Sequence, residues 1–385
     1  MKKFFTSFHR VLPVPINLKI FSAGVTFLSN IIFAKMFNAP SPRGPLFVTW
    51  LATFDCNAYC SFCATHTLKK RLPEALSRER AIEVAHEIGR AGTFAVGFSG
   101  GETLLWPYQF DVIHALKQHR VVTYIVTNGL LLRENADAIL EHQVDYIVVS
   151  LDTYHAEEHN KLRNVPELFE RAIEGIEYLK RKRKGRRPLI KSTTILSRKT
   201  LPQMADILDR LEQVVDVTSI QPIMYGFDRS PHARDKESLG DLVFPEDEEQ
   251  KVTAQMDSLI QSRPEFNNTY FKLIPTYWFH REALIQKYHC WSPFLRIQIM
   301  PNGDVSHCHV NPKYSTIGNL NQSSLMEIWN NVEFRRQREE IRRHENACIC
   351  WDQSAALNIF LDSLPILNRL PLLNKTSQDS KRKPA

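Results

Sequence analysis

The sequence lacks an apolar segment long enough to cross a lipid bilayer. The uncharged stretch from Ile20 to Ala34 has about 15 residues, which gives a helix of roughly 22 Å, whereas the hydrocarbon core of a membrane is about 30 Å thick. The chain also has little net charge outside one segment. The basic run from Lys180 to Arg187 accounts for the whole formal charge of +7, so the rest of the chain is formally neutral. We interpret that run as the solvated end of a helix rather than a contact with nucleic acid or an anionic membrane.

Cysteine is rare and its number is odd, with seven among 385 residues. An odd number excludes a framework built purely of disulfides, and the clustered spacing points to metal chemistry in a reducing cytoplasm. Cys56, Cys60 and Cys63 follow an apolar run from Phe47 to Thr53. A cubane iron–sulfur cluster normally takes four thiolates, so three leave one iron open to another ligand. The alternative is a closed zinc site completed by His66.

A second motif follows the next apolar run, Thr93 to Phe98, where Ser99 leads into the triplet Gly100, Gly101 and Glu102. Two adjacent glycines let a ligand approach the backbone closely, and a carboxylate can accept hydrogen bonds from an amino group. The sequence therefore predicts a ligand site shared by the two motifs.

Together the motifs resemble those of the radical S-adenosylmethionine (radical SAM) superfamily, whose cysteine loop reads C-x3-C-x-aromatic-C, with Phe62 in the aromatic position. The resemblance implies that Cys56, Cys60 and Cys63 hold a [4Fe-4S] cluster. Its open iron would bind the amino and carboxylate groups of S-adenosylmethionine, with Gly100, Gly101 and Glu102 at the amino end. The resemblance favours this cluster over zinc.

Strand-like runs alternate with helical patterns in the first part of the chain, and this alternation predicts parallel strands. The strand-like runs are Phe47 to Thr53, Phe94 to Phe98, Val121 to Val126, Asp145 to Leu151, Leu189 to Leu196 and Val217 to Ile223. The amphipathic stretches Ser77 to Arg90, Arg133 to His142 and Leu168 to Lys182 would cover the outside of the sheet. The resemblance implies an α/β fold with an open six-stranded (β/α)6 partial TIM barrel, whose active site lies at the carboxyl ends of the strands.

Polar residues at those strand ends are candidates for binding the cofactor. Asn128 follows the third strand, and Ser150 and Asp152 end the fourth. In similar family members the serine and the acid lie near the adenosyl sugar, and Arg163 would engage the methionine carboxylate. Gln221, at the end of the sixth strand, is a candidate for the adenine. The alternatives are helix capping by Ser150 or Asp152 and a surface ion pair for Arg163.

The last quarter of the chain holds the other four cysteines, Cys290, Cys308, Cys348 and Cys350. Asn302-Gly303 lies between alternating runs and predicts a β-hairpin turn. This pattern resembles the entry of the SPASM or shortened twitch domain, and so does the helical stretch from Leu325 to Trp329. The resemblance implies a small C-terminal domain, a β-hairpin plus a helix, that binds an auxiliary [4Fe-4S] cluster.

The C-terminal pattern departs from its relatives, because Cys348 and Cys350 form C-x-C where C-x2-C is common. In the full SPASM form three or more further cysteines follow, and because they are lacking here, two auxiliary clusters are not expected. The shorter C-x-C spacing leaves open whether both thiols reach one cluster, and His307 or His309 could replace one thiolate. A four-cysteine zinc site and free structural cysteines remain alternatives.

We expect five segments: an amphipathic N-terminal segment (1–46), the barrel (47–240), a connecting helical segment (241–288), the cluster-binding domain (289–360) and a tail (361–385). In the first segment Lys19 and Asn30 lie on a polar stripe, and Phe21 and Leu28 on an apolar one. That apolar face could lie in a membrane interface or pack on the barrel. A secretory signal fits poorly, because exported clusters would meet oxidant. The apolar tail from Leu361 could dock beside this segment.

The resemblance also implies the chemistry. An electron from a reductase or a flavodoxin-type donor enters the first cluster, S-adenosylmethionine is cleaved, and a 5′-deoxyadenosyl radical abstracts hydrogen from the substrate. We expect a peptide or small-metabolite substrate, with the auxiliary cluster assisting oxidation or bond formation. Two alternatives stay open: the same chemistry on a lipid or polyprenyl-linked substrate at the membrane, and a non-enzymatic iron–sulfur or zinc module that contacts nucleic acid.

Overall fold

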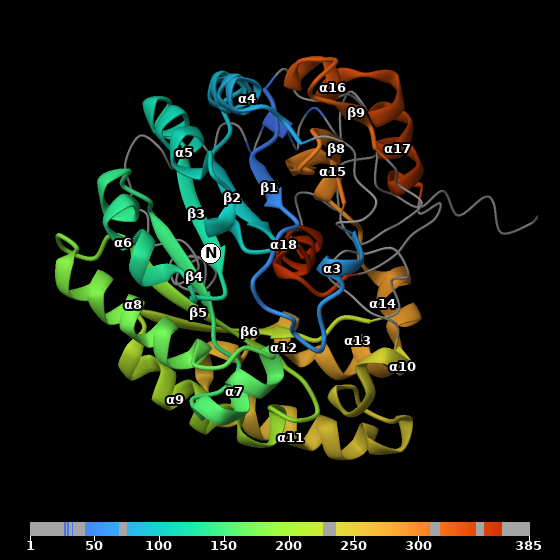
Figure 1. The fold of residues 1–385 in the computed structure, drawn as a ribbon. Coiled ribbons are helices and arrows are strands. Elements are labelled where there is room, and N and C mark those ends of the chain that lie inside the picture. The colour runs from blue at the N-terminus through green and yellow to red at the C-terminus, as the bar shows by residue number, and fades with distance from the viewer. Residues whose placement is uncertain are drawn as a thin grey trace, which may run out of the picture.

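The computed structural model describes residues 27, 29, 30, 33, 43–68, 75–225, 236–308, 316–343 and 350–363. Within these residues one nine-stranded sheet runs in the order β6-β5-β4-β3-β2-β1-β7-β8-β9 (Figure 1). Its strands are β1 (Phe47–Thr53), β2 (Ala95–Gly100), β3 (Val122–Thr127), β4 (Tyr146–Ser150), β5 (Leu189–Leu196), β6 (Val217–Pro222), β7 (Arg296–Ile299), β8 (Asp304–Ser306) and β9 (Gly318–Asn319).

Strands β1 to β6 are all parallel, as the alternation of strands and helices predicted. The bounds of β1 and β5 agree with the predicted runs residue for residue, and the other strands differ by one or two residues at an end. The helices of this half are α3 (Thr65–Leu68), α4 (Arg78–Arg90), α5 (Gln109–Gln118), α6 (Leu132–Glu141), α7 (Ala156–Arg163), α8 (Leu168–Lys182) and α9 (Met204–Val214). The sheet curves as a partial barrel, with α4, α5, α6, α8 and α9 along its outer side (Figure 1).

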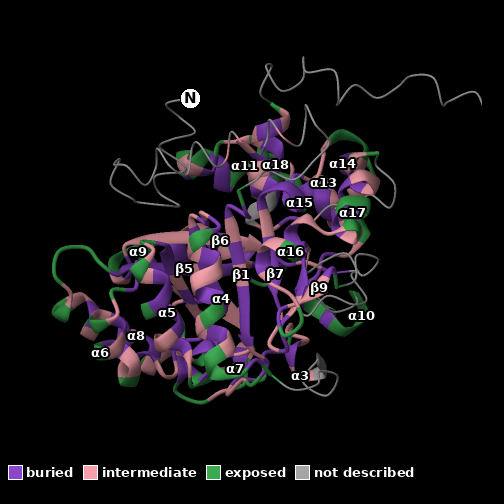
Figure 2. Ribbon diagram, turned by 90° about the horizontal axis from the view of Figure 1, so that it is seen from above, coloured by how far each residue is buried: buried purple, intermediate pink, exposed green. Residues whose placement is uncertain are grey.

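The remaining helices belong to the connecting and C-terminal parts. They are α10 (Lys236–Leu239), α11 (Glu249–Ser262), α12 (Thr269–Lys272), α13 (Ile274–Phe279), α14 (Arg281–Lys287), α15 (Ser292–Leu295), α16 (Leu325–Asn330), α17 (Val332–Arg342) and α18 (Gln353–Asp362). Figure 2 shows buried residues along the sheet and exposed ones on the outer turns of the helices. This is the distribution expected when helices cover a parallel sheet.

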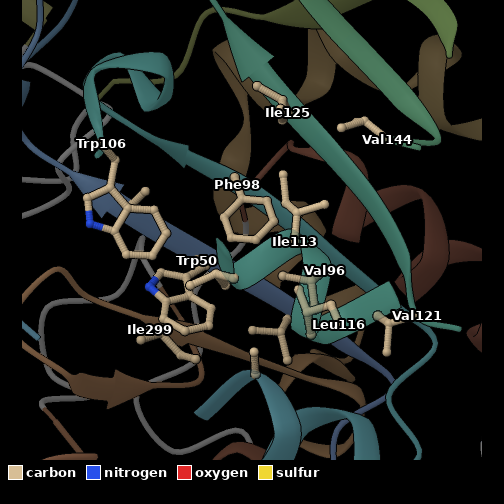
Figure 3. Packing of buried hydrophobic residues seen from close by; sticks show 14 of the residues in the cluster. Trp50, Val96, Phe98, Trp106, Ile113, Leu116, Val121, Ile125, Val144 and Ile299 are labelled. Carbon is tan, nitrogen blue, oxygen red and sulfur yellow. The ribbon is translucent and has the colours of Figure 1, made fainter. Parts of the chain in front are cut away.

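The largest core fills the space between the outer face of the sheet and the helices. Val96 and Phe98 of β2 and Ile125 of β3 pack there against Ile113 and Leu116 of α5 (Figure 3). Because side chains alternate along a strand, the neighbouring residues of the same strands face the barrel interior. An apolar interior cluster takes one residue from each of four strands: Ala95, Val122, Tyr146 and Leu189.

The predicted C-terminal hairpin is present and extends the barrel sheet. β7 pairs in parallel with β1, so that Phe47 lies opposite Arg296. β8 then returns antiparallel to β7, and Gly303 in the turn has φ of +84°, a conformation that glycine adopts without strain. The cluster-binding hairpin is therefore continuous with the edge of the barrel that carries the first cysteine loop.

Most of the N-terminal segment lies outside the described residues, including Lys19, Phe21 and Leu28 of the predicted stripes, whereas Asn30 of the polar stripe is described. Of those described, Phe27 packs in one cluster with Trp291, Leu295 and Leu361. Asn30 is buried, and its side-chain Nδ2 donates to the carbonyl of Gly44 at 3.2 Å. Where described, the segment therefore contacts the rest of the protein. None of the helices that the structure describes has the length and apolar character needed to span a bilayer.

Candidate functional site

The loop after β1 carries the first three cysteines and is anchored to the end of α7. The N–H groups of Tyr59 and Ser61 donate to the carbonyls of Arg163 and Leu162, each at 3.2 Å. Cys60 is buried, whereas Cys56 and Cys63 are half-buried. The loop therefore presents three thiols at the carboxyl end of β1, where the family resemblance expects a cluster.

Burial raises the pKa of the Cys56 thiol, and it raises the pKa of Cys60 to about 11. The guanidinium of Arg163 works in the opposite direction at Cys60, with Nη1 at 3.9 Å from Sγ. Thiols with raised pKa values keep their protons at neutral pH until a metal takes the place of the proton. The donor set therefore fits a cluster whose thiolates form on metal binding.

His66, which would complete the zinc alternative, is engaged by the protein itself. Its Nε2 lies 2.7 Å from the carbonyl oxygen of Ala58. Its ring also stacks on Tyr59, with the centroids 4.2 Å apart. Among the described residues, no three His, Cys, Asp or Glu side chains converge on a point where a single metal ion would sit.

Gly100 and Gly101 bring the end of β2 against the cysteine loop. The N–H of Gly101 donates to the carbonyl of Thr53 at 2.7 Å, and the N–H of Glu102 donates to that of Asp55 at 2.8 Å. A Cβ at Gly100 would lie 2.3 Å from the Thr53 oxygen, and one at Gly101 would lie 2.1 Å from the Asp55 oxygen. The lack of side chains at the two glycines therefore allows the two motifs to pack together. What lies against the glycines in this structure is the backbone of the cysteine loop.

Glu102 is fully buried and joins the end of β2 to that of β3. Its Oε1 accepts from the Thr127 hydroxyl at 2.7 Å and from the Leu104 N–H at 3.2 Å, and its Oε2 accepts from the Asn128 N–H at 2.8 Å. Burial raises the pKa of this carboxyl. A carboxylate oxygen can accept two hydrogen bonds, so Oε2 keeps the capacity for one more donor. A contact of Glu102 with the cofactor amino group stays a prediction.

Asn128 links the third strand to the cysteine loop. Its Nδ2 donates to the side-chain oxygen of Asn57 at 2.7 Å, and its Oδ1 accepts from the N–H of Leu130 at 2.9 Å. Sequence reasoning selected Asn128 but missed its partner Asn57. The polarity of Asn57 within the cysteine loop was the only available signal.

Asp152 and Arg163 form a buried ion pair, where the sequence-based alternative was a surface pair. Arg163 Nε donates to Asp152 Oδ2 at 2.8 Å, and Arg163 is only 6% exposed. The other carboxylate oxygen accepts from the N–H of Ile195 at 3.2 Å. Ser150, the last residue of β4, lies nearby at the same end of the sheet. Arg163 thus connects the fourth strand to Cys60, and its contact with a cofactor carboxylate stays a prediction.

Gln221, proposed for the adenine, is positioned by the C-terminal part of the chain. Its Nε2 donates to the carbonyl of Trp351 at 2.8 Å. Trp351 follows Cys350, and Cys350 belongs to an apolar group with Cys308 and Met224. The end of the sixth strand therefore lies beside the second set of cysteines.

Around those cysteines, Asp352 accepts a hydrogen bond from Cys350 at 3.4 Å and pairs with Arg296 at 3.5 Å. Arg296 also donates to the Thr49 hydroxyl of β1 at 2.9 Å. No pattern in the sequence predicted this connection, because Thr49 and Arg296 are far apart along the chain. Cys290 is half-buried at the start of the domain, and Cys348 and His309 lie outside the described residues.

His307, considered as a substitute ligand, is buried beside α17. Its Nδ1 lies 3.1 Å from Oε1 of Gln337, and its ring stacks on Phe334. Burial and the nearby guanidinium of Arg338 lower its pKa to about 3, so the ring is neutral at physiological pH. Its role as a ligand stays a prediction.

Comparison with known proteins identifies two regions of the chain. A family model described as the radical SAM superfamily matches residues 50–211, and one described as an iron–sulfur cluster-binding (SPASM) domain matches residues 290–352. The AdoMet-dependent heme synthase of Methanosarcina barkeri is 26% identical over 80% of this chain and 89% of its own. The mycofactocin maturase MftC of Mycobacterium ulcerans is 24% identical over 80% of this chain and 79% of its own.

Solved structures with the same fold include Streptococcus suis SuiB bound to its precursor peptide SuiA, with a TM-score of 0.57 at 17% identity. That likeness covers 76% of this chain and 66% of SuiB. The structure of anSMEcpe with bound AdoMet has a TM-score of 0.55 at 16% identity, over 78% of this chain and 84% of that one. At these identities the likeness shows the fold alone.

Proposed function

The chain belongs to the radical SAM superfamily and carries a C-terminal SPASM domain, and from this premise we propose that it abstracts hydrogen from a peptide or small-metabolite substrate. It is an enzyme whose cofactors are a [4Fe-4S] cluster, S-adenosylmethionine and an iron–sulfur cluster of the SPASM domain. When bound, the cluster and S-adenosylmethionine would supply the radical chemistry that hydrogen abstraction requires.

One observation carries the proposal: the elements that bear both motifs and both cysteine sets meet at the carboxyl ends of the strands. The glycines of the β2 end contact the Cys56–Cys63 loop, and Gln221 of β6 contacts the segment after Cys350. In α/β barrels this end of the sheet carries the active site. We infer that the substrate reaches the barrel interior from here.

The protein's own residues would then have separate tasks. Cys56, Cys60 and Cys63 would hold the first cluster, and Arg163 would stabilise the Cys60 thiolate across the 3.9 Å contact. The buried ion pair with Asp152 keeps the Arg163 guanidinium oriented. Cys290, Cys308, Cys348 and Cys350 would hold the auxiliary cluster. A reductase or flavodoxin-type protein in a reducing cytoplasm would supply the electron.

The substrate class is supported by the relatives and neighbours. MftC is a maturase, and SuiB was solved with a precursor peptide. The name of the heme synthase gives heme, a small metabolite, as its product. No observation in the described residues favours a lipid substrate over these two.

The test is anaerobic reconstitution followed by metal analysis and turnover. Wild type should bind about eight iron atoms per chain, because two cubanes of four are implied, and Cys56, Cys60 and Cys63 changed together to Ala should leave about four. With a strong reductant wild type should release 5′-deoxyadenosine and methionine, and Cys60→Ala should not. Full iron content in the triple variant, or zinc in place of iron, would contradict the proposal.

A further inference from the structure

Lys191 lies on the interior face of the barrel, on strand β5, which is the neighbour of the edge strand β6. Leu189, two residues earlier in β5, belongs to the interior apolar cluster, whereas Ile190 packs in the outer core with the helices. Because side chains alternate along a strand, Lys191 faces the same way as Leu189. Its register partners on the neighbouring strands are Val148 and Val217.

The ammonium group of Lys191 has no partner in the part of the chain that the structure describes. The residue is 6% exposed, and it makes no hydrogen bond or ion pair with a described residue. Burial alone lowers its pKa to about 8, and no neighbouring charge contributes. At neutral pH the group is therefore still largely protonated. A buried cation without a counter-charge is costly and is seldom retained for stability.

Two other cations at the barrel, Arg296 and Arg163, each have a carboxylate partner. Arg296 pairs with Asp352, and Arg163 pairs with Asp152. On the neighbouring strand β4, the hydroxyl of Tyr146 is buried without a hydrogen-bond partner among the described residues, and so is Oε1 of Gln298 on β7. The described interior thus offers one unbalanced positive charge and additional polar atoms that lack partners.

Lys191 also lies close enough to the carboxyl ends of the strands to meet a molecule that enters the barrel there. Thr193, two residues further along β5, pairs in register with Ser150 at the carboxyl end of β4. Two residues of a strand span about 6.6 Å, so Lys191 lies just below the rim where the cofactor is proposed to bind. A molecule that enters from the carboxyl ends of the strands would reach the cofactor first and Lys191 next.

We propose that Lys191 binds a carboxylate of the substrate inside the barrel, so that the substrate is a carboxylate-bearing peptide or small acid. This inference rests on the proposed function and adds the substrate's charge to it. A single ammonium matches the single charge of a carboxylate, whereas a phosphate carries nearly two charges at neutral pH and accepts more hydrogen bonds.

The test uses the full chain, reconstituted with its clusters and S-adenosylmethionine, and follows its melting temperature. The probes are acetate and succinate, compared with acetamide at equal ionic strength. Carboxylates should raise the melting temperature of wild type and of the exposed-loop control Lys184→Met, but not that of Lys191→Met. Acetamide should shift none of them. An equal carboxylate shift in all three proteins would overturn the proposal.

A second measurement covers the case in which Lys191→Met folds poorly. In wild type, the rate at which methyl acetimidate modifies Lys191 is followed by peptide mass spectrometry, with Lys184 as the internal control. Succinate should slow the modification of Lys191 several-fold and leave Lys184 unchanged. An unaffected rate, or a Lys191 that is never modified, would overturn the proposal. Neither measurement uses a reductant, so a failure of S-adenosylmethionine cleavage is scored separately and counts against the proposed function.

Discussion

At the scale of single residues, His159 shows how the environment of the site sets protonation. The ring is fully buried, and its Nδ1 accepts the N–H of Asp152 at 3.2 Å, which leaves the proton on Nε2. That Nε2 is buried without a partner among the described residues. Burial, and then the charge of Arg163, lower the pKa of His159 to about 4. The folded protein therefore holds this histidine neutral.

This depressed pKa predicts a pH-dependent stability. In the unfolded chain His159 titrates near its ordinary value of about 6.5, so its contribution is full above that pH and is lost as the pH falls toward 4. The loss amounts to about 3 kcal/mol over this window. His159→Gln should flatten the pH dependence of urea unfolding there, whereas the exposed His280→Gln should not. Equal slopes for wild type and His159→Gln would contradict the assignment.

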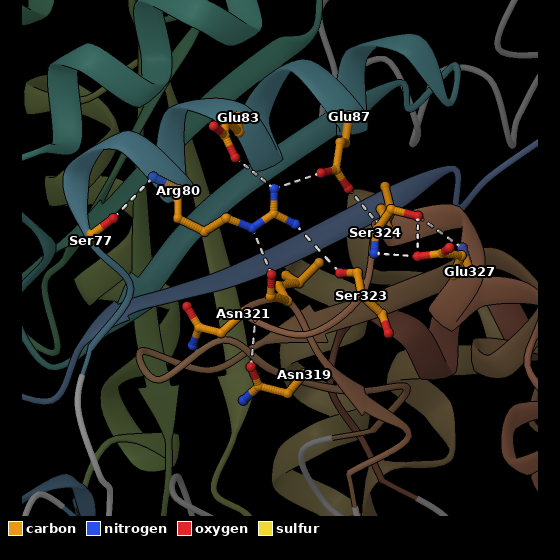
Figure 4. Close-up of polar contacts among 11 residues, drawn as sticks. Ser77, Arg80, Glu83, Glu87, Asn319, Asn321, Ser323, Ser324 and Glu327 are labelled. Carbon is orange, nitrogen blue, oxygen red and sulfur yellow. Dashed lines mark hydrogen bonds and ion pairs between the residues drawn. The ribbon is translucent and has the colours of Figure 1, made fainter.

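At the scale of elements, helix α4 joins the barrel to the SPASM domain by polar contacts (Figure 4), in addition to the pairing of β1 with β7. Arg80 donates from Nε to the carbonyl of Leu320 at 2.6 Å and from Nη1 to Glu87 at 2.7 Å. Glu87 in turn accepts the N–H of Leu325, in the first turn of α16, at 2.6 Å. The helix thus satisfies backbone groups that the start of α16 leaves without helical partners.

We expect Arg80→Met to loosen the SPASM domain and spare the barrel. Losing the charge-assisted bonds should cost about 1–3 kcal/mol, because the Leu320 carbonyl and Glu87 lose their donor. Hydrogen exchange should accelerate in α16 and β9 while α6 and α8 stay protected. The matched control is Arg78→Met, whose exposed pair with Asp111 should contribute little. Uniform acceleration in both domains would refute a local bridge.

At the scale of the whole molecule, a described residue of the N-terminal segment and the end of helix α18 meet beside Trp291. Phe27 from the N-terminal segment and Leu361 from the end of α18 share a cluster with Trp291. Trp291 is fixed there by Asp362, which accepts from its indole Nε1 at 2.9 Å. This contact supports intramolecular packing of the segment, and its binding to a membrane stays a prediction.

Phe27→Glu should therefore lower the melting temperature of the whole protein. Placing a carboxylate in this apolar cluster should cost about 1–3 kcal/mol, which corresponds to a few degrees for a chain of this size. Flotation with anionic liposomes provides the counter-test. Wild type that floats, together with a Phe27→Glu protein that is released and melts normally, would assign the segment to the membrane instead.

The sequence by itself determined the local features of this protein. Strand alternation predicted six parallel strands, with β1 and β5 placed residue for residue, because buried parallel strands need apolar runs that are visible locally. The cysteine loop and the Gly100-Gly101-Glu102 triplet could likewise be identified, because a cluster loop and a tight backbone contact each require particular residues at fixed spacing.

Only the tertiary structure decided the contacts between distant segments. The parallel pairing of β7 with β1, the burial of Asp152 with Arg163, and the protein partners of Glu102 all depend on which segments become neighbours. Lys191 is the clearest case. From the sequence alone a lysine in a strand is expected to be exposed, whereas the folded barrel buries this one. The physical reason is that spacing along a chain constrains the chemistry of one loop, whereas burial and charge balance arise from the whole fold.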